Sequence, residues 1–228
     1  MTNIHPTALV DPAAEVAEDA EIGPFSVIGP KVRIGSGSWI GAHVMVTGRT
    51  TIGDNTTIRE MCTFSRGSMQ GGGKTIIGND NWIMACVHIA HDCILGDHII
   101  MANNTSLAGH VTVGDWAILS GYSLIHQFCT VGEHSFTSFA SYVNRSIPPY
   151  VTVSGEKARA KGVNVEGLKR RGYSKEQIQR VRRAYKLLYR SGIPLDEATD
   201  QLVDWAREHD EIKPLVDFLE VTEKSFLR

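Results

Sequence analysis

The chain has little that would suit a membrane protein, a secreted protein or a nucleic-acid-binding protein. No apolar run approaches the roughly 20 residues that a membrane-spanning helix needs, and residues 1–15 lack the basic start and apolar stretch of a signal peptide. Lys and Arg number 23 against 25 Asp and Glu, a net charge of −2, which argues against nucleic acid as a partner. Four cysteines form no CxxC pair and no disulfide-framework spacing, so we expect reduced thiols inside the core of a cytoplasmic protein: Cys62, Cys86, Cys93 and Cys129.

Aromatic residues and proline are also scarce, at 7% of the chain and 8 residues, whereas glycine occurs 22 times. This composition is neither disordered nor collagen-like. The 228 residues, 42% of them apolar, suit one large domain or a large and a small one. A chain of this size can bury a substantial core without disulfides or metals.

An aliphatic or aromatic residue recurs every six positions over most of the chain. The series runs from Val10 to Phe64 and from Ile77 to Val143, with Thr137 as its polar exception. Period six fits neither a helix nor simple strand alternation, and an ordinary β-sandwich would show turn signals about every 8–12 residues. The period predicts a parallel β-helix, in which three six-residue pieces close one coil and the apolar residue points inward. Glycines that follow the apolar residue are expected to give the corners their backbone freedom.

The repeat is interrupted once and stops near residue 150. Between Phe64 and Ile77 the numbering advances by 13 instead of 12, and the glycines at 71–73 predict a loop ejected from the prism or, on weaker grounds, a phosphate-binding loop. We therefore expect residues 1–150 to form the β-helix and residues 151–228 to form a C-terminal extension with a small α-helical domain.

Three helices are predicted in the C-terminal region. Ser174 is a plausible N-cap with Gln177 three residues on, and Gly192 ends the helix that follows. A second helix follows Pro194, and a third extends to Phe226. Residues 151–190 carry 12 Lys and Arg against 3 Glu, a net +9 that leaves −11 for the rest of the chain. Such a run indicates either a solvated helix face or a docking surface for an acidic partner.

The repeat register places polar side chains along one edge of the predicted prism. Ile89, Leu107 and Ile125 differ by 18 and occupy one face in successive coils, so His91 stacks against Gly109. By the strand spacing, the whole polar set lies within roughly 10 Å. Its members are His91, Asp92, Gly109, His110, His126 and Gln127.

Two chemistries fit this edge. Three histidines could bind zinc, but His88 and His91 lie on different sides of a turn, and the HxxxxH spacing of hexapeptide-repeat carbonic anhydrases is missing. In acyl transfer, a neutral His91 oriented by Asp92 would remove a proton from an attacking hydroxyl. The backbone N–H of Gly109 would then stabilise the tetrahedral oxyanion.

Five segments together carry a family resemblance: HIAHDC at 88–93, NNTSLAGHVTVGD at 103–115, IHQFC at 125–129, PPYV at 148–151 and GVNVEGLKRRG at 162–172. Over nearly its whole length the chain resembles the acyl-carrier-protein–UDP-N-acetylglucosamine O-acyltransferases of lipid A synthesis. The resemblance implies a left-handed parallel β-helix and a homotrimer with active sites between subunits. It also implies transfer of an (R)-3-hydroxyacyl group from acyl-carrier protein to the 3-hydroxyl of the UDP-sugar. No metal or other cofactor is implied, since the acyl group arrives on the carrier protein's phosphopantetheine.

The same resemblance assigns roles to individual residues. It makes His91 the general base, with Asp92 beside it and Gly109 in the oxyanion hole. The implied substrate-binding residues are His88, His110, His126, Gln127, Asn164, Glu166, Arg170 and Arg171. Arginine suits a diphosphate because its guanidinium binds phosphate oxygens in pairs.

Two departures from the family bear on specificity. Family members are longer, and the missing residues fall around Ile52–Ile58, where members have a loop that touches the acceptor sugar. The chain is therefore either an enzyme for UDP-N-acetylglucosamine, a paralogue acylating another nucleotide-linked or amino sugar, or a non-catalytic scaffold that binds such a sugar or the carrier protein.

The second departure is in the acyl-chain pocket, where Phe139 replaces a small residue, Phe136 lies nearby and Lys157 replaces a histidine. These residues predict a donor of about ten carbons or fewer, because a packed site does not absorb a ring's volume without strain. The alternative is that both rings fill the prism or the trimer core.

Overall fold

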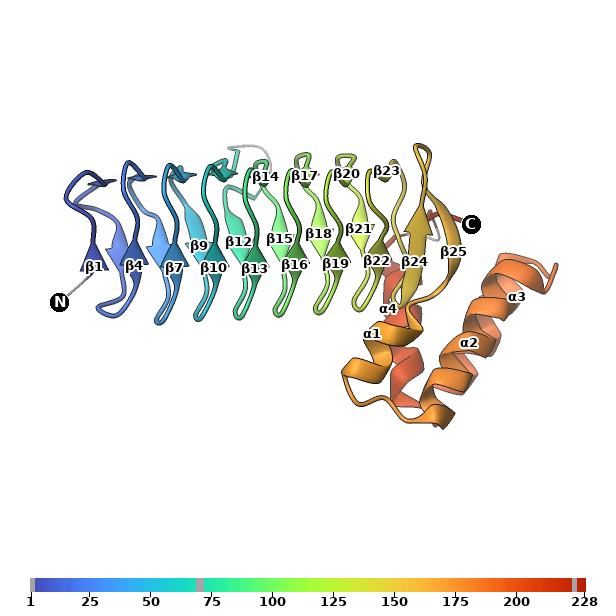
Figure 1. The fold of residues 1–228 in the computed structure, drawn as a ribbon. Coiled ribbons are helices and arrows are strands. Elements are labelled where there is room, and N and C mark those ends of the chain that lie inside the picture. Colours follow the sequence, from blue (N-terminus) through green and yellow to red (C-terminus); the bar gives the residue numbers. More distant parts are fainter. Residues whose placement is uncertain (1–2, 69–71, 223–224) are drawn as a thin grey trace.

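The structure is a computed structural model that describes residues 3–68, 72–222 and 225–228. Short strands stack into a long prism with three parallel sheets as its faces, and the helices gather at its C-terminal end (Figure 1). The fold is thus mostly β, a parallel β-helix followed by helices, as the six-residue period predicted.

The three faces are called sheets A, B and C, and each consists of strands one coil apart. Sheet A contains β1 (Asn3–Ile4), β4 (Glu21–Ile22), β7 (Trp39–Ile40), β10 (Thr57–Ile58), β13 (Trp82–Ile83), β16 (Ile100–Met101), β19 (Ile118–Leu119), β22 (Phe136–Thr137), β24 (Val151–Ser154) and β25 (Arg159–Val163). Sheet B contains β2 (Leu9–Val10), β5 (Val27–Ile28), β8 (Met45–Val46), β11 (Thr63–Phe64), β14 (His88–Ile89), β17 (Ser106–Leu107), β20 (Leu124–Ile125) and β23 (Tyr142–Val143). Sheet C contains β3 (Glu15–Val16), β6 (Arg33–Ile34), β9 (Thr50–Ile52), β12 (Thr75–Ile77), β15 (Ile94–Leu95), β18 (Thr112–Val113) and β21 (Thr130–Val131).

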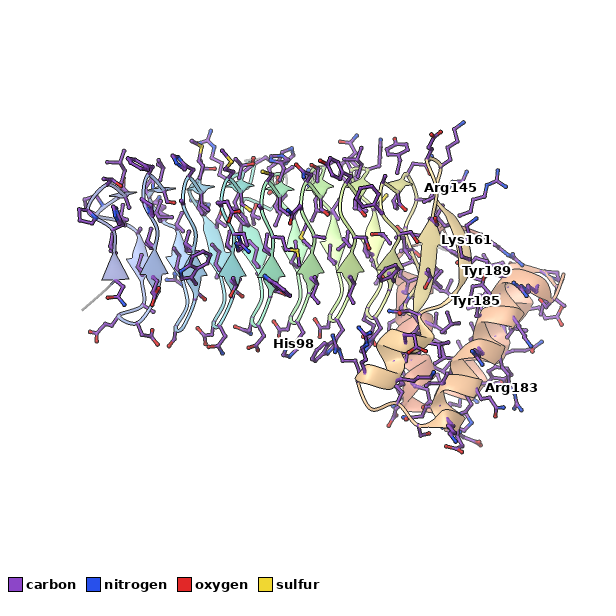
Figure 2. The ribbon with its side chains drawn as sticks, viewed as in Figure 1. His98, Arg145, Lys161, Arg183, Tyr185 and Tyr189 are labelled. Carbon is purple, nitrogen blue, oxygen red and sulfur yellow. The ribbon has the colours of Figure 1, made fainter. Side chains whose placement is uncertain are left out.

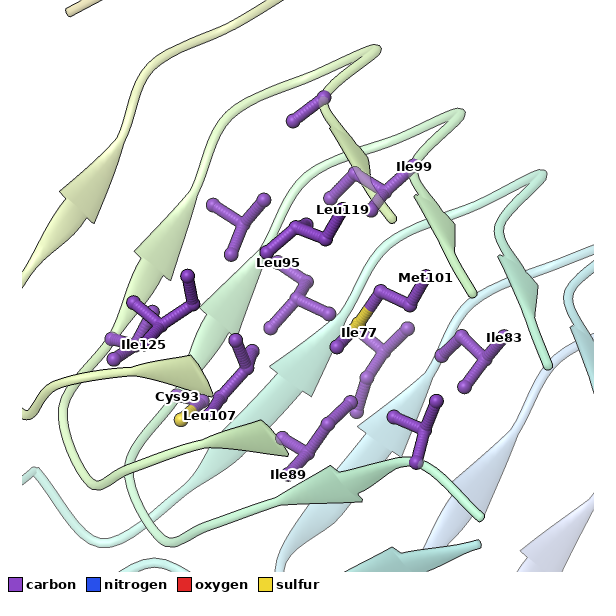
Figure 3. Packing of buried hydrophobic residues seen from close by; sticks show 14 of the residues in the cluster. Ile77, Ile83, Ile89, Cys93, Leu95, Ile99, Met101, Leu107, Leu119 and Ile125 are labelled. Atoms are coloured by element: carbon purple, nitrogen blue, oxygen red, sulfur yellow. The ribbon is translucent and has the colours of Figure 1, made fainter. Parts of the chain in front are cut away.

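The inward column of aliphatic side chains forms the core (Figure 3). Ile83, Ile89 and Leu107 are fully buried, and each such side chain contributes about 1.5–3 kcal/mol by leaving water. The polar exception, Thr137, is buried as well, and its hydroxyl lies 2.7 Å from the Ser123 hydroxyl. A buried hydroxyl with a hydrogen-bond partner avoids most of the cost of desolvation.

The cysteine prediction holds for three residues and is wrong for the fourth. Cys62, Cys93 and Cys129 are buried and free, whereas Cys86 is exposed. Cys86 occupies a turn position with φ of 60°, not an inward position, so its side chain cannot join the core.

The predicted role of the repeat glycines is also wrong. Eighteen of the described non-glycine residues make the corner turns with φ between 51° and 71°, while Gly23, Gly53 and Gly78 have no left-handed conformation. These glycines are needed because the next coil passes so close. A Cβ at Gly23 would lie 2.7 Å from the carbonyl carbon of Gly41, and one at Gly53 would lie 2.6 Å from the oxygen of Gly78.

Replacing Gly23 by alanine is therefore expected to destabilise the prism. The new methyl group would meet only backbone atoms of the next coil, so we expect a loss of about 1–3 kcal/mol, as for other overpacked sites. Gly162→Ala is the matched control, because nothing lies within 4 Å of its Cβ position and its φ is not left-handed. Chemical denaturation checks both variants, and equal stabilities would contradict this reading of the glycines.

The interruption is longer than the sequence count suggests. β11 and β12 are consecutive strands of sheets B and C, so the long step between Phe64 and Ile77 replaces a single step of six. Phe64 consequently pairs with Ile89, whereas Ile89 pairs with Leu107 at the usual separation of one coil. The predicted ejected segment is thus a seven-residue insertion at the edge between sheets B and C. Gly71 lies outside the described residues.

The C-terminal region first extends sheet A and then becomes helical. β24 pairs in parallel with β22, and β25 returns antiparallel to β24. The helices are α1 (Val165–Arg170), α2 (Lys175–Arg190), α3 (Leu195–Ala206), the 3-10 helix η1 (Asp210–Ile212) and α4 (Lys213–Val221). Tyr185 and Tyr189 on α2 lie near β25 and join the core of the β-helix (Figure 2).

Most of the helix predictions are confirmed. Ser174 and Gln177 form the predicted capping box, and Gly192 follows α2 with φ of 76°. The third helix is shorter than predicted, because α4 ends at Val221 and Phe226 pairs instead with Ser146 of the β-helix. α1 had no sequence signal strong enough to predict it. Among the described residues, no helix combines the length and apolar character needed to cross a bilayer.

Candidate active site

The candidate site centres on a histidine–carboxylate pair at the edge between sheets B and C. β14 ends at Ile89, and the turn that follows presents His91 and Asp92, with Asp92 at φ of 60°. The Nδ1 atom of His91 lies 2.9 Å from Oδ2 of Asp92. The Asp92 side chain is 2% exposed and the His91 side chain is 46% exposed. A solvent-accessible imidazole is thus fixed by a carboxylate that solvent does not reach.

The seven-residue insertion fixes this carboxylate in turn. The backbone N–H of Ser68 lies 3.0 and 2.9 Å from the two Asp92 oxygens, and the N–H of Gly73 donates to Oδ1 at 3.2 Å. Burial opposes ionisation, but the hydrogen bonds from Ser68 and His91 and the nearby His110 outweigh it and lower the pKa of Asp92 to about 2. Asp92 is therefore an anion at every pH at which His91 could act as a base.

Gly109 lies directly beside the His91 ring, as the register predicted. A Cβ at Gly109 would lie 2.6 Å from Cε1 and 2.8 Å from Nε2 of His91, so only glycine leaves room for the ring in this position. Among the described residues, none accepts a hydrogen bond from the Gly109 N–H. A free backbone donor next to an imidazole is the arrangement that oxyanion stabilisation requires.

A third polar residue completes the cluster and raises the question of a metal. His110 lies one coil beyond Asp92, with Nε2 3.9 Å from Oδ2, and its ring packs edge-on against His91 at 5.1 Å. One ligand atom from each of His91, Asp92 and His110 lies within 4.8 Å of the others, a spacing at which a cation could be held. The Asp92 oxygens already accept hydrogen bonds from two backbone N–H groups and from His91, so these protein donors occupy lone pairs that a cation would otherwise use.

The remaining predicted residues of this edge lie around the cluster. His88 points outward from sheet B, with Nδ1 2.7 Å from the Thr63 hydroxyl, and burial lowers its pKa. Gln127 lies one coil beyond Gly109, and His126 lies one coil beyond Ala108. Both are exposed, and His126 Nδ1 lies 3.1 Å from the Gln127 carbonyl oxygen. The predicted edge is therefore assembled as expected.

The predicted nucleotide contacts occupy a different edge, between sheets C and A. Asn164 caps α1 by accepting a hydrogen bond from Gly167 and donates one to the carbonyl of His134. Glu166 is exposed and forms an ion pair with Lys169 at 2.8 Å. Arg170 is exposed at the end of α1. In the described chain, none of these residues shares a contact with His91.

Arg171 stacks on a ring that the sequence reasoning missed. Its guanidinium lies 4.1 Å above the Trp116 ring, and Trp116 is stacked on His98 at 3.8 Å. His98, Trp116 and His134 follow one another at one-coil intervals, so the repeat spacing itself could have revealed this column. Burial and the neighbouring Arg170 lower the pKa of Arg171.

The three residues of the predicted acyl pocket are near the A/B edge and the end of the prism. Phe139 is 69% exposed and packs edge-on against Tyr122 at 5.5 Å, so it does not fill the prism. Phe136 points outward from β22 and is half-buried. Lys157 is exposed in the turn between β24 and β25. Sheet B separates this edge from His91.

One family model, the curated relatives and the solved structures of 28% identity or more name the same family. The family model described as Udp N-acetylglucosamine O-acyltransferase, Domain 2 matches residues 147–227, and the GMPPB C-terminal domain model matches residues 4–113. The acyl-[acyl-carrier-protein]–UDP-N-acetylglucosamine O-acyltransferase of Thiobacillus denitrificans is 54% identical over 171 residues. The LpxA structure from Acinetobacter baumannii is 40% identical, with a TM-score of 0.87, and the match covers 99% of this chain and 100% of that one. The chain belongs to this acyltransferase family.

Other acyltransferases of the family give the same picture. The Moraxella catarrhalis UDP-N-acetylglucosamine O-acyltransferase structure is 36% identical with a TM-score of 0.89, covering 99% of this chain and 100% of that chain. The alignment with the Thiobacillus denitrificans relative covers 75% of this chain and 66% of that protein. The chain thus matches just under two thirds of that relative's length.

Proposed function

We propose that the protein transfers an (R)-3-hydroxyacyl group from acyl-carrier protein to the 3-hydroxyl of UDP-N-acetylglucosamine, as a homotrimer in the cytoplasm. The supporting observation is the buried Asp92 carboxylate that holds His91 beside the free N–H of Gly109. Four cysteines without disulfide partners suit a reducing compartment.

The proposed reaction begins with proton transfer to His91. Because Nδ1 is hydrogen-bonded to Asp92, Nε2 is the atom that takes the proton from the sugar hydroxyl. The hydroxyl oxygen then attacks the thioester carbonyl, and the resulting oxyanion accepts a hydrogen bond from the N–H of Gly109. When the intermediate collapses, the C–S bond breaks and the phosphopantetheine thiolate takes the proton from His91. Ionised Asp92 stabilises the imidazolium throughout.

The separation of the two residue groups supports the trimer. The base lies at the B/C edge, whereas Asn164, Glu166 and the two arginines lie at the C/A edge of the same chain. A single substrate would reach both groups if a second copy placed its C/A edge against the first copy's B/C edge. Exposed apolar side chains on sheet B and the A/B edge would also be covered in such an assembly: Tyr122, Leu124, Phe139 and Tyr142.

The carrier protein is proposed to dock on the basic C-terminal region. Two of its cations are paired, Arg180 with the buried Glu211 and Lys169 with Glu166. By contrast, Lys161 on β25 and Arg183 on α2 form no ion pair with a described residue, and both side chains project from the surface (Figure 2). Acyl-carrier proteins are acidic, so unpaired surface cations would favour their association.

The proposed acyl path crosses the outer face of sheet B from His91 towards Phe139. Because the Phe139 ring stands at the far edge, we expect a short donor of about ten carbons or fewer and a longer preferred chain in Phe139→Gly. Competition between donors of different length, with products weighed by mass spectrometry, measures the preference. Phe25→Gly is the matched control, since Phe25 is also exposed on the A/B edge. A wild-type preference for a fourteen-carbon donor would contradict the assignment.

Two other functions make different predictions. A non-catalytic scaffold would bind UDP-N-acetylglucosamine but release no carrier-protein thiol with any acyl donor. A zinc enzyme built on His91, Asp92 and His110 would contain stoichiometric metal by elemental analysis. The acyltransferase predicts thiol release that depends on the UDP-sugar and persists after chelation. A paralogue would give this release with a different nucleotide-linked or amino sugar.

A further inference from the structure

A cleft of about 940 Å³ opens beside His91 on the B/C edge, on the side towards the N-terminus. It is formed by three successive turns of the prism and by the described ends of the insertion. The residues that line it include Lys31, Arg49, Arg66, Ser68, Gly73 and His91. Of these residues, the proposed mechanism gives no role to Lys31, Arg49 or Arg66.

Three cationic side chains line the cleft. Lys31 and Arg49 occupy the same corner in successive coils, each with a left-handed φ. Arg66 follows on the next coil, where β11 pairs with β8. All three side chains are exposed, and none forms an ion pair with a described residue. No Asp or Glu is among the described residues that line the cleft.

The cations are connected to the catalytic pair through the insertion. The Nη1 atom of Arg49 lies 3.6 Å from the Cβ position of Gly73, whose N–H donates to Asp92. Asp92 forms no ion pair with these cations, because its carboxylate is buried and accepts its hydrogen bonds from Ser68, Gly73 and His91. The prism thus brings Arg49 within one coil of Arg66 and places both along the edge that carries the base.

We propose that this cleft binds a phosphate group of a substrate while its reacting atom is at His91. Several unpaired cations on one concave surface recognise a phosphate ester or diphosphate by charge and, through the arginines, by paired hydrogen bonds. The proposal rests on the proposed function for the identity of the two substrates. The phosphate belongs either to the diphosphate of the nucleotide sugar or to the phosphodiester of the carrier-protein arm.

The test uses the full-length Arg49→Gln, Arg66→Gln double variant, with Arg33→Gln as the control. Arg33 is also an exposed arginine of the N-terminal half, but it points outward from sheet C, pairs with Glu15 and does not line the cleft. Titration calorimetry with UDP-N-acetylglucosamine measures the acceptor. Steady-state kinetics with acyl-phosphopantetheine and with acyl-pantetheine, which lacks the phosphate, measures the donor. Circular dichroism checks that each variant is folded.

A phosphate site predicts a loss of affinity of roughly tenfold in the double variant and none in the control. If the acceptor supplies the phosphate, the Kd for UDP-N-acetylglucosamine rises. If the donor supplies it, the KM for acyl-phosphopantetheine rises and the KM for acyl-pantetheine does not. Changes below twofold in every arm would overturn the proposal. An inactive wild-type protein would refute the acyltransferase function instead, and calorimetry would then decide the phosphate site alone.

Discussion

The His91→Ala variant is expected to lose at least about 100-fold in turnover rate, which is the lower end of what a general base contributes. Its imidazole is half-exposed and lies against Gly109, so its removal leaves the buried Asp92 without contact to the reacting hydroxyl. A coupled thiol-release assay with saturating substrates measures the loss. The melting temperature is expected to change little, since the ring lies outside the core.

His5→Ala is the control for this experiment, because His5 is an exposed histidine near the N-terminus whose ring hydrogen-bonds only Thr7 among the described residues. It is expected to keep wild-type turnover. Near-normal turnover in His91→Ala would mean that His91 is not the base.

The Asp92→Asn variant is expected to lose between about 100-fold and 10,000-fold in turnover. An amide presents a donor where the carboxylate accepts, so it cannot satisfy Ser68, Gly73 and the His91 Nδ1–H at once. His91 would then adopt the wrong tautomer or orientation, as in catalytic triads whose aspartate becomes asparagine. Asp80→Asn is the matched control, since Asp80 also sits in a left-handed turn beside a histidine, 3.9 Å from His98.

The stability difference between the wild type and Asp92→Asn is also expected to depend on pH. Asp92 has a folded-state pKa of about 2, below its ordinary value of 3.8. Its charge therefore stabilises the fold fully above pH 3.8, and this contribution is lost as the pH falls towards 2. The stability gap between wild type and Asp92→Asn should narrow over that window when unfolding is followed by circular dichroism. A gap that stays constant from pH 6 to pH 2 would contradict the role of the ionised carboxylate.

The sequence predicted the prism and the polar edge that carries His91 because both follow from one period. A six-residue period determines which residues point inward, and a coil of three such pieces determines which residues stack in successive coils. The contact between His91 and Gly109 could therefore be predicted from the period alone. Turn geometry was harder to predict. The left-handed positions are occupied by residues as different as Lys31, Cys86 and Trp116, whose side chains give no common signal.

Contacts that depend on irregular backbone could not be predicted. The two N–H groups that bind Asp92 come from the insertion, where no repeat defines the register. The pairing that brings Arg49 and Arg66 together follows from the repeat, since Val46 and Phe64 are one regular coil apart, whereas the wall that Ser68 and Gly73 of the insertion add to the cleft has no repeat to predict it. Phe226 lies outside its predicted helix: its backbone forms a β-bridge with Ser146, and its ring packs against Tyr189 and Phe218.

Acyl transfer to a nucleotide sugar at His91 is tested most directly by the mass of the product. Purified protein is incubated with UDP-N-acetylglucosamine and (R)-3-hydroxyacyl carrier protein of several chain lengths, and the nucleotide fraction is analysed by mass spectrometry. The proposed function predicts UDP-N-acetylglucosamine carrying one hydroxyacyl ester, together with an equal amount of free carrier-protein thiol. His91→Ala is expected to form both products at least about 100-fold more slowly. Binding of the UDP-sugar without any acylated product, whatever the donor, would contradict it.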